Sequence, residues 1–126
     1  MGLSVVHGAA IAGAAKIIAV DVLPNKLDMA ARLGATHVVD AAKEDAVGRI
    51  LELTDGYGAD YAFEAVGTPR TIEQALSSVH RGGTAVVIGV SPAGSKITLD
   101  TSSIQPERVL MGSSFGGVKQ LADVPM

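Results

Sequence analysis

An aspartate at the end of an apolar run carries the strongest chemical signal in the sequence. Residues 17–22 read IIAVDV, and Asp21 in this run lies 19 residues after Gly2. In a dinucleotide-binding βαβ unit, the last glycine of G-x-G-x-x-G lets helix and strand pack closely, and an acid about 20 residues later accepts hydrogen bonds from the adenosine ribose. The spacing therefore predicts a dinucleotide site that includes both residues. The simpler structural interpretation, in which Asp21 only caps the following turn, stays open.

The charge of Asp21 also bears on which dinucleotide would bind. A 2′-phosphate about 4 Å from the carboxylate would meet a repulsion of up to about 4 kcal/mol at an effective dielectric constant near 20. No arginine directly follows Asp21 to receive such a phosphate, so NAD is favoured over NADP. Lys26, five residues further on, is either within reach of the same ribose edge or an exposed lysine in the first turn of a helix.

Three other apolar runs end in small residues that could face the same ligand. They end at residues 64–67 (EAVG), 88–90 (IGV) and 113–115 (SSF). In a doubly wound sheet, ligands bind at the carboxyl ends of the strands. Glycine at two of these ends would let a flat ring approach the backbone. Any one of these strand ends alone is an ordinary turn. The position of all three at one edge of the sheet is what predicts a site.

The elements that must position these residues alternate between helix and strand. The hydrophobic pattern and the Gly and Pro positions predict helices over 3–15, 24–33, 44–54 and 69–80, and strands over 17–22, 37–41, 59–67, 84–90, 96–99 and 108–115. Strands without polar alternation must be covered on both faces, as in a parallel sheet flanked by helices. The predicted class is therefore doubly wound α/β.

Composition excludes several other kinds of protein. With 126 residues and 48% apolar residues, the chain is one domain at most. A net charge of −3 leaves no basic surface for nucleic acid. Lys16 and Asp21 interrupt the best apolar run, and no basic segment precedes it, so we expect neither a membrane span nor a secretory signal. The absence of cysteine favours the cytoplasm and, with no paired histidines, argues against a metal site in this chain.

The sequence resembles the coenzyme domain of zinc-dependent medium-chain alcohol dehydrogenases, in the branch of the glutathione- or mycothiol-type formaldehyde dehydrogenases. The resemblance covers essentially the whole chain and rests on A-V-D-x-x-x-x-K, L-G-A-T, F-E-x-x-G, x-G-V and G-S-x-F-G-G, in that order. It implies a Rossmann-like fold, NAD as the cofactor, and hydride transfer from a primary alcohol or a hydroxymethyl thiol adduct.

The resemblance also implies roles for individual residues. Asp21 and Lys26 would bind the adenosine ribose, Ala65 and Val66 would line the adenine side, and Gly67 would shape that loop. Nicotinamide would lie against Ile88, Gly89 and Val90, and its carboxamide would be oriented by Val90 and the backbone near Ser113 and Phe115. Gly2 matches the last glycine of the family's phosphate-binding turn, and Met1 stands where that turn carries valine, at a position that touches pyrophosphate and nicotinamide.

Other parts of the family pattern are absent from residues 1–126. The catalytic zinc is held in the family by cysteine and histidine ligands of a separate domain, so zinc is expected only there and the isolated chain is predicted to be inactive. The chain is interpreted as a partial dinucleotide-binding domain that lacks the first, central strand and its glycine-rich loop. We expect a gap between two halves of the sheet, and marginal stability for the chain alone.

Residues 96–99 (KITL) resemble the strand that pairs across the family's dimer axis, which implies a homo-oligomer. Two alternative interpretations of the whole chain stay open. One is a non-catalytic remnant that binds nucleotide weakly or not at all. The other is an unrelated doubly wound enzyme such as an S-adenosylmethionine methyltransferase, which also places an acid after its second strand.

Overall fold

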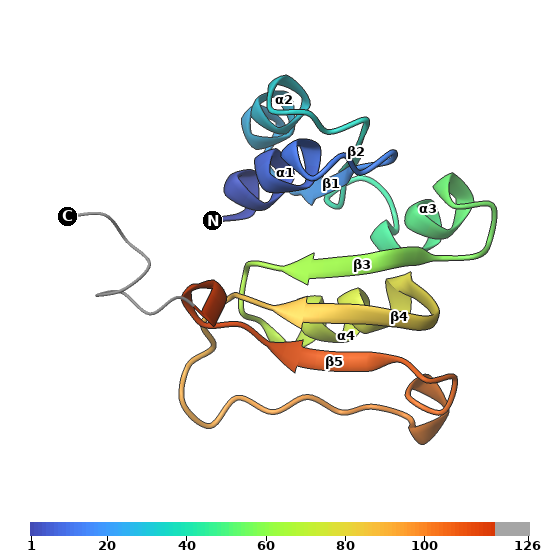
Figure 1. Ribbon diagram of the computed structural model, residues 1–126. Coiled ribbons are helices and arrows are strands. Elements are labelled where there is room, and N and C mark those ends of the chain that lie inside the picture. Colours follow the sequence, from blue (N-terminus) through green and yellow to red (C-terminus); the bar gives the residue numbers. More distant parts are fainter. Residues whose placement is uncertain (118–126) are drawn as a thin grey trace.

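Helices alternate with parallel strands along nearly the whole chain (Figure 1). The computed structural model describes residues 1–117. Its elements are α1 (Gly2–Ile11), β1 (Ile18–Asp21), α2 (Pro24–Arg32), β2 (His37–Asp40), α3 (Ala46–Leu53), β3 (Ala59–Glu64), α4 (Pro69–Ser78), β4 (Val79–Val87), η1 (Thr101–Ser103), β5 (Val109–Gly112) and η2 (Phe115–Gly117). This succession confirms the predicted α/β class.

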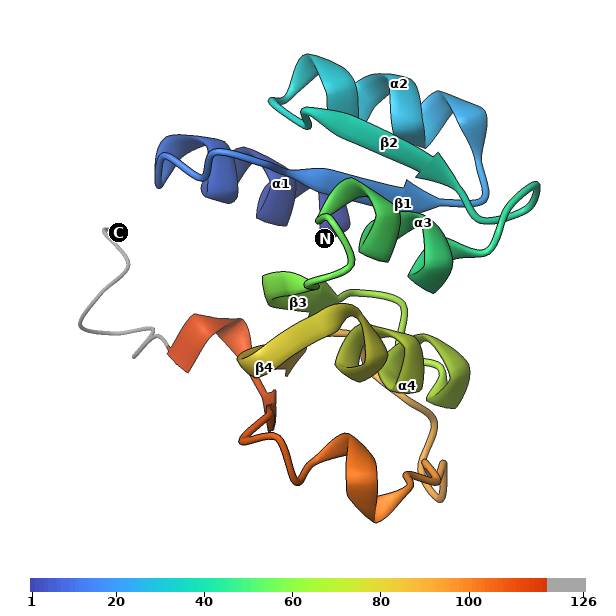
Figure 2. The same cartoon turned by 90° about the vertical axis from the view of Figure 1, so that its right-hand side faces the viewer.

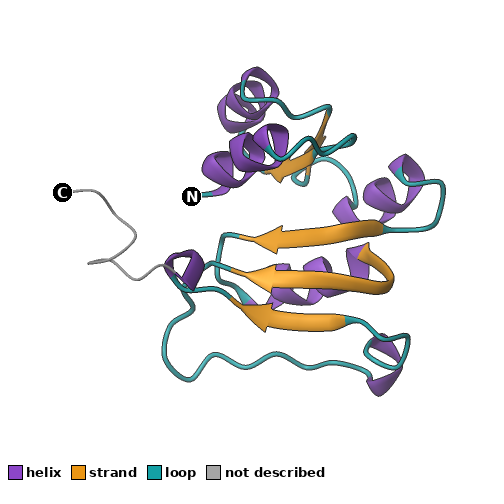
Figure 3. Ribbon diagram, viewed as in Figure 1, coloured by secondary structure: helices purple, strands orange, loops and turns teal. Residues whose placement is uncertain are grey.

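The strands form two parallel sheets rather than one (Figure 3). β1 pairs with β2, and β4 pairs with both β3 and β5. Within residues 1–117, no strand of one sheet pairs with a strand of the other, so an edge of each sheet is unpaired. The expected gap lies where a doubly wound order would place a strand between β1 and β3.

The helices begin where the sequence supplies caps. Asp45 Oδ2 accepts a hydrogen bond from Gly48 N at 3.2 Å at the start of α3, and Thr68 Oγ1 accepts one from Thr71 N at 3.2 Å at the start of α4. Pro24 stands in the first turn of α2 and Pro69 in the first turn of α4, where a missing N–H costs nothing. Local chemistry therefore accounts for these helix starts.

Several predicted boundaries were wrong. α1 ends at Ile11, before Gly13, which adopts a positive φ of 81°. Val79 and His80 do not end α4 but begin β4, where Val79 pairs with Ala59. The predicted strands over 59–67, 84–90 and 108–115 end earlier, at Glu64, Val87 and Gly112. The last residues of those three runs therefore lie in turns beyond the carboxyl ends of the strands, where a ligand site is expected.

Residues 96–99 form no strand in the structure, contrary to the prediction. Thr98 N instead donates a hydrogen bond of 3.0 Å to Glu73 Oε1 on α4. A strand needs a neighbouring strand for its backbone hydrogen bonds, and no described strand of this chain pairs with this segment.

The three-stranded sheet has a core on one face only. Leu76 of α4 packs with Val79 and Ala85, and the figures show α4 along one face of β3 and β4 (Figure 2). On the opposite face Tyr61 is 64% exposed, Phe63 47% and Met111 50%. Within residues 1–117 this face of the sheet therefore keeps large apolar side chains exposed.

Candidate functional site

The predicted ribose ligand lies at the carboxyl end of β1. Asp21 Oδ1 accepts hydrogen bonds from Val22 N at 2.7 Å and Leu23 N at 3.0 Å, so the carboxylate does cap the following turn. Oδ2 has no hydrogen-bond partner within residues 1–117. The simpler structural interpretation is thus correct for one oxygen, while the other is left as an acceptor for a hydroxyl group. Lys26 lies exposed in the first turn of α2.

A second carboxylate stands beside the first. The register of the β1–β2 ladder pairs Asp21 with Asp40, which ends β2. Asp40 Oδ1 caps its own turn by accepting from Ala42 N at 3.0 Å, and its Oδ2 lies 3.6 Å from Lys43 Nζ. Sequence reasoning missed Asp40, although the HVVD run that contains it has the same form as the AVD run before it. The two acids together make this sheet edge negative.

A cavity of about 210 Å³ opens between the carboxyl ends of β1 and β2 and the start of α4. Its lining consists of Val22, Ala41, Glu44, Asp45, Ala46, Arg70, Thr71 and Gln74. Arg70 makes no ion pair with any described residue. Sequence reasoning missed Arg70, because the fold brings it beside Val22 from 48 positions further along the chain. Arg70 therefore lines the same cavity as Val22, the residue that follows Asp21.

The first two residues lie at the amino end of α1. Gly2 is the first residue of this ten-residue helix, and a Cβ built on it would lie 3.8 Å from the Ala65 Cβ. That is an ordinary van der Waals contact, so the space would admit an alanine. Met1 is exposed and makes no side-chain cap. The unpaired N–H groups of a helix start suit an anion such as pyrophosphate.

The turn after β3 and the turn after β4 interlock. Gly67 adopts a positive φ of 90°, and a Cβ there would lie 2.5 Å from Val90 O. A Cβ on Gly89 would lie 2.3 Å from Gly67 N. Ser91 Oγ donates a 2.7 Å hydrogen bond to Gly67 O, and Ile88 N donates one of 2.8 Å to the Glu64 carbonyl. Both glycines are required by close backbone approach, and the turns form one rigid unit.

This unit presents apolar side chains to solvent. Val66 is 66% exposed and Val90 84% exposed at the same edge of the sheet. Ser113 N donates a 2.9 Å hydrogen bond to Val87 O, so the backbone after β5 adjoins the turn after β4. Phe115 begins η2 two residues later. The structure thus brings the three predicted strand ends together, while the roles of their residues stay predictions.

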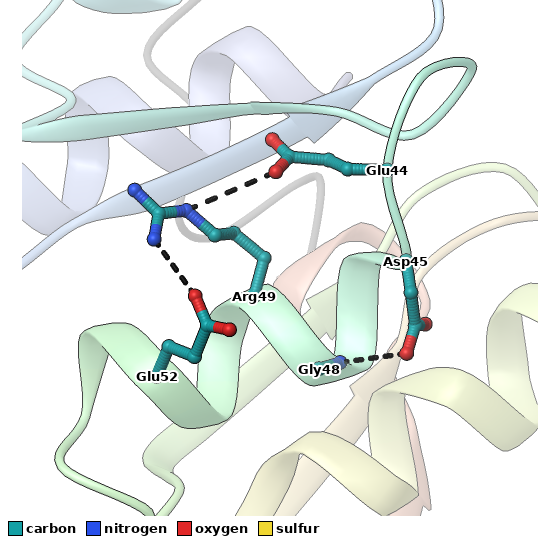
Figure 4. Close-up of a pocket in the computed structure, with 5 residues that line it drawn as sticks. All are labelled: Glu44, Asp45, Gly48, Arg49 and Glu52. Carbon is teal, nitrogen blue, oxygen red and sulfur yellow. Dashed lines mark hydrogen bonds and ion pairs between the residues drawn. The ribbon is translucent and has the colours of Figure 1, made fainter.

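A second depression, also of about 210 Å³, lies along α3 and is lined by Glu44, Asp45, Gly48, Arg49 and Glu52 (Figure 4). Arg49 forms ion pairs with Glu52 at 2.9 Å and Glu44 at 3.9 Å. These ion pairs lie on an exposed helix surface, which is a structural arrangement. Among the described residues, no group of three or more histidines, cysteines or acids could hold a metal ion, and no helix is long and apolar enough to cross a membrane.

Comparison with known proteins gives consistent matches. A family model described as zinc-binding dehydrogenase matches residues 1–124. The chain is 41% identical over 130 residues to the alcohol dehydrogenase class-3 of Drosophila melanogaster, covering 99% of this chain and 34% of that protein. It is 37% identical over 127 residues to the S-(hydroxymethyl)glutathione dehydrogenase of Synechocystis sp., with coverages of 99% and 34%.

A solved structure shares the fold. The zinc-binding dehydrogenase of Sinorhizobium meliloti 1021, bound to NADP, matches with a TM-score of 0.84 and 32% identity, over 88% of this chain and 33% of that chain. The chain spans about a third of the length of the curated relatives it matches.

Proposed function

Because the chain belongs to the zinc-binding dehydrogenase family, we propose that residues 1–126 are the partial coenzyme-binding domain of an NAD-dependent zinc-type alcohol or formaldehyde dehydrogenase. One observation carries this proposal. The carboxyl ends of the parallel strands bear the two interlocked turns after β3 and β4, the unpaired oxygen of Asp21 and a cavity. Ligands of doubly wound folds bind at that edge.

The described residues fit a dinucleotide along this edge. Asp21 Oδ2 accepts hydrogen bonds from the adenosine ribose, with Lys26 nearby, and the cavity lined by Val22 and Arg70 receives the adenine. Pyrophosphate lies at the amino end of α1, beside Gly2 and Met1. Ala65, Val66 and Gly67 face the adenine side.

Ile88, Gly89 and Val90 hold the nicotinamide, whose carboxamide meets the backbone at Ser113 and Phe115. The bound dinucleotide supplies a hydride acceptor at the nicotinamide ring.

Zinc does not fit residues 1–117, the part of the chain that the structure describes. The sequence has no cysteine, and the described residues contain no cluster that could bind a metal. Any zinc site of the full enzyme would therefore belong to a domain outside residues 1–126. We propose a primary alcohol or a hydroxymethyl thiol adduct as the substrate, which the similarity to an alcohol dehydrogenase class-3 and to an S-(hydroxymethyl)glutathione dehydrogenase supports.

The cofactor preference rests on two opposing groups. Asp21 and its neighbour Asp40 disfavour a 2′-phosphate, whereas Arg70 would attract one. Lys43 already pairs with Asp40 at 3.6 Å, so the unpaired oxygen of Asp21 is the group that favours NAD, although a relative with this fold is bound to NADP. We also propose a homo-oligomer in the cytoplasm, on the resemblance of residues 96–99 to a dimer strand and on the absence of cysteine.

The test is a titration of the chain with NADH, followed by the coenzyme's own fluorescence, because the sequence contains no tryptophan. We expect saturable binding that ADP-ribose reverses and S-adenosylmethionine does not. Family membership already argues against the methyltransferase alternative. Absence of saturable binding would instead support the non-catalytic remnant and overturn the proposal.

The chain alone should not oxidise a primary alcohol, because its described residues contain no cluster of histidines, cysteines or acids that could hold zinc. Incubation with NAD, ethanol or a hydroxymethyl thiol adduct, and added Zn²⁺ should give no NADH absorbance. Turnover that depends on Zn²⁺ would show that a catalytic metal site lies within residues 1–126 after all.

A further inference from the structure

Glu64 is a buried acid at the centre of the interlocked turns. It ends β3 and is 4% exposed. Its Oε1 accepts three hydrogen bonds, from Val66 N at 2.8 Å, Gly67 N at 2.7 Å and Thr71 Oγ1 at 2.8 Å. A buried polar group is costly unless it is hydrogen-bonded. Two of the three donors are main-chain N–H groups of the turn after β3, so this oxygen holds that turn.

The second carboxylate oxygen points at the other turn. Oε2 is buried and has no hydrogen-bond partner among the described residues. A Cβ on Gly89 would lie 2.8 Å from it, so the acid and the turn after β4 are in close contact. The main-chain carbonyl of Glu64 also accepts from Ile88 N at 2.8 Å and Gly89 N at 3.0 Å. One residue therefore holds both turns.

The third donor connects Glu64 with the cavity. Thr71 lines the 210 Å³ cavity beside Arg70, and its hydroxyl group donates a hydrogen bond to Glu64 Oε1. A continuous set of contacts thus runs from the cavity through Thr71 and the carboxylate to Gly89. In the site proposed above, the two ends of this set lie against the adenosine and the nicotinamide.

We propose that Glu64 is a positioning residue that couples the adenosine side of the coenzyme site to the nicotinamide turn. The inference rests on the proposed function, because it assumes that a nicotinamide dinucleotide occupies this edge. Glu64 does not contact the ligand. It fixes the backbone of residues 65–67 and 88–89, so that the nicotinamide turn is already in position when the adenosine part of the coenzyme binds.

The experiment compares Glu64→Gln with the unmodified chain by titration with NADH and with ADP-ribose, which lacks the nicotinamide. Gln keeps the shape and one acceptor, but it puts an amide N–H₂ against Gly89 where the structure offers no acceptor. We expect the NADH affinity to fall about tenfold and the ADP-ribose affinity to change by less than about threefold. The fluorescence yield of each bound NADH should also fall, because the ring is no longer held against its turn.

Thr71→Val and Thr71→Ser test the same contacts by a milder route, in case Glu64→Gln does not fold. Val removes the donor to Oε1 and should, like Glu64→Gln, lower the NADH affinity and the fluorescence yield of each bound NADH. Ser keeps a hydroxyl and should restore most of both. The matched control is Glu73→Gln on α4, where one oxygen accepts a single hydrogen bond from Thr98 N away from the turns.

The outcomes separate the two proposals. If the unmodified chain binds no NADH, the proposed function fails and the role of Glu64 fails with it. If the chain binds NADH, and the variants at 64 and 71 bind it with equal affinity and yield, the positioning role fails alone. Equal loss of NADH and ADP-ribose affinity with an unchanged yield would indicate a merely structural acid, and would also overturn the inference.

Discussion

Substitution of Asp21 by asparagine should relax the discrimination between NADH and NADPH. Asparagine keeps an oxygen that can accept from Val22 N and Leu23 N, so the turn after β1 keeps its cap. What the substitution removes is the negative charge beside the ribose 2′ position. The variant therefore isolates electrostatic repulsion of the 2′-phosphate from the local folding role of the side chain.

The size of the effect follows from Coulomb's law. Two unit charges about 4 Å apart repel by about 1 kcal/mol in bulk water and about 4 kcal/mol at an effective dielectric constant of 20. Asp21 is half-buried at the sheet edge, so its environment lies between these limits. Since about 1.4 kcal/mol is a tenfold change in affinity, the ratio of the two dissociation constants should shift by about fivefold to about a thousandfold.

The assay is a pair of fluorescence titrations, with NADH and with NADPH, at low and at moderate ionic strength. The shift should shrink as salt is added, because exposed charges are screened over about 10 Å at 0.1 M. Asp60→Asn is the control. Asp60 lies near the start of β3, away from the carboxyl ends of the strands, and pairs with His80 at 2.8 Å. A ratio that Asp21→Asn leaves unchanged within twofold would refute the ribose role of this carboxylate.

Three further predictions test other parts of the structure. In the Asp21→Asn background, Arg70→Ala should weaken NADPH about fivefold more than NADH, because only NADPH carries a 2′-phosphate for the guanidinium group; equal losses in parallel titrations would contradict this. Gly67→Ala should lower the free energy of unfolding by at least about 2 kcal/mol, since it adds left-handed strain to a 2.5 Å clash with Val90 O. Gly94→Ala, at a φ of 86° in open space, should cost only the strain, and equal denaturation curves for the two variants would argue against the interlocked turns. The chain alone should unfold with a free energy below the usual range of about 5–15 kcal/mol, because each sheet has an unpaired edge; a steep melt that is independent of protein concentration would contradict that expectation.

The succession of helices and strands could be predicted because local chemistry determines it. Apolar runs bounded by glycine, proline and capping residues indicate where an element begins, as at Asp45 and Thr68. The ends of strands could not be predicted as well, because a strand ends where its neighbour stops pairing. Val79 follows helical spacing from Ile72, yet it pairs with Ala59 and belongs to β4. Pairing partners far along the chain decided these boundaries.

The candidate site was predictable to a similar extent. Glycines with positive φ and an acid after a strand leave a signature in the sequence, so the turns and Asp21 were found. Arg70 leaves none, and Glu64 was found only as part of a strand end, because the roles of both residues depend on which groups the fold brings beside them. Arg70 lies beside Val22 only after the two sheets are placed together, and the burial of Glu64 depends on the packing of two separate turns.

The proposed coenzyme would span two sheets that share no paired strands, so its binding should stabilise both. Val22 and Ala41 follow strands of the β1–β2 sheet, whereas Arg70 and Thr71 begin the helix that covers the other sheet, and the cavity lies between these pairs. A ligand that binds only the assembled form stabilises it by about 2.7 kcal/mol at a hundred times its dissociation constant. Hydrogen exchange of the β1 and β4 amides, measured with and without NADH at that concentration, should slow by the same factor in both sheets. Slowing confined to one sheet would show that the ligand does not bridge them, and would place the site on that sheet alone.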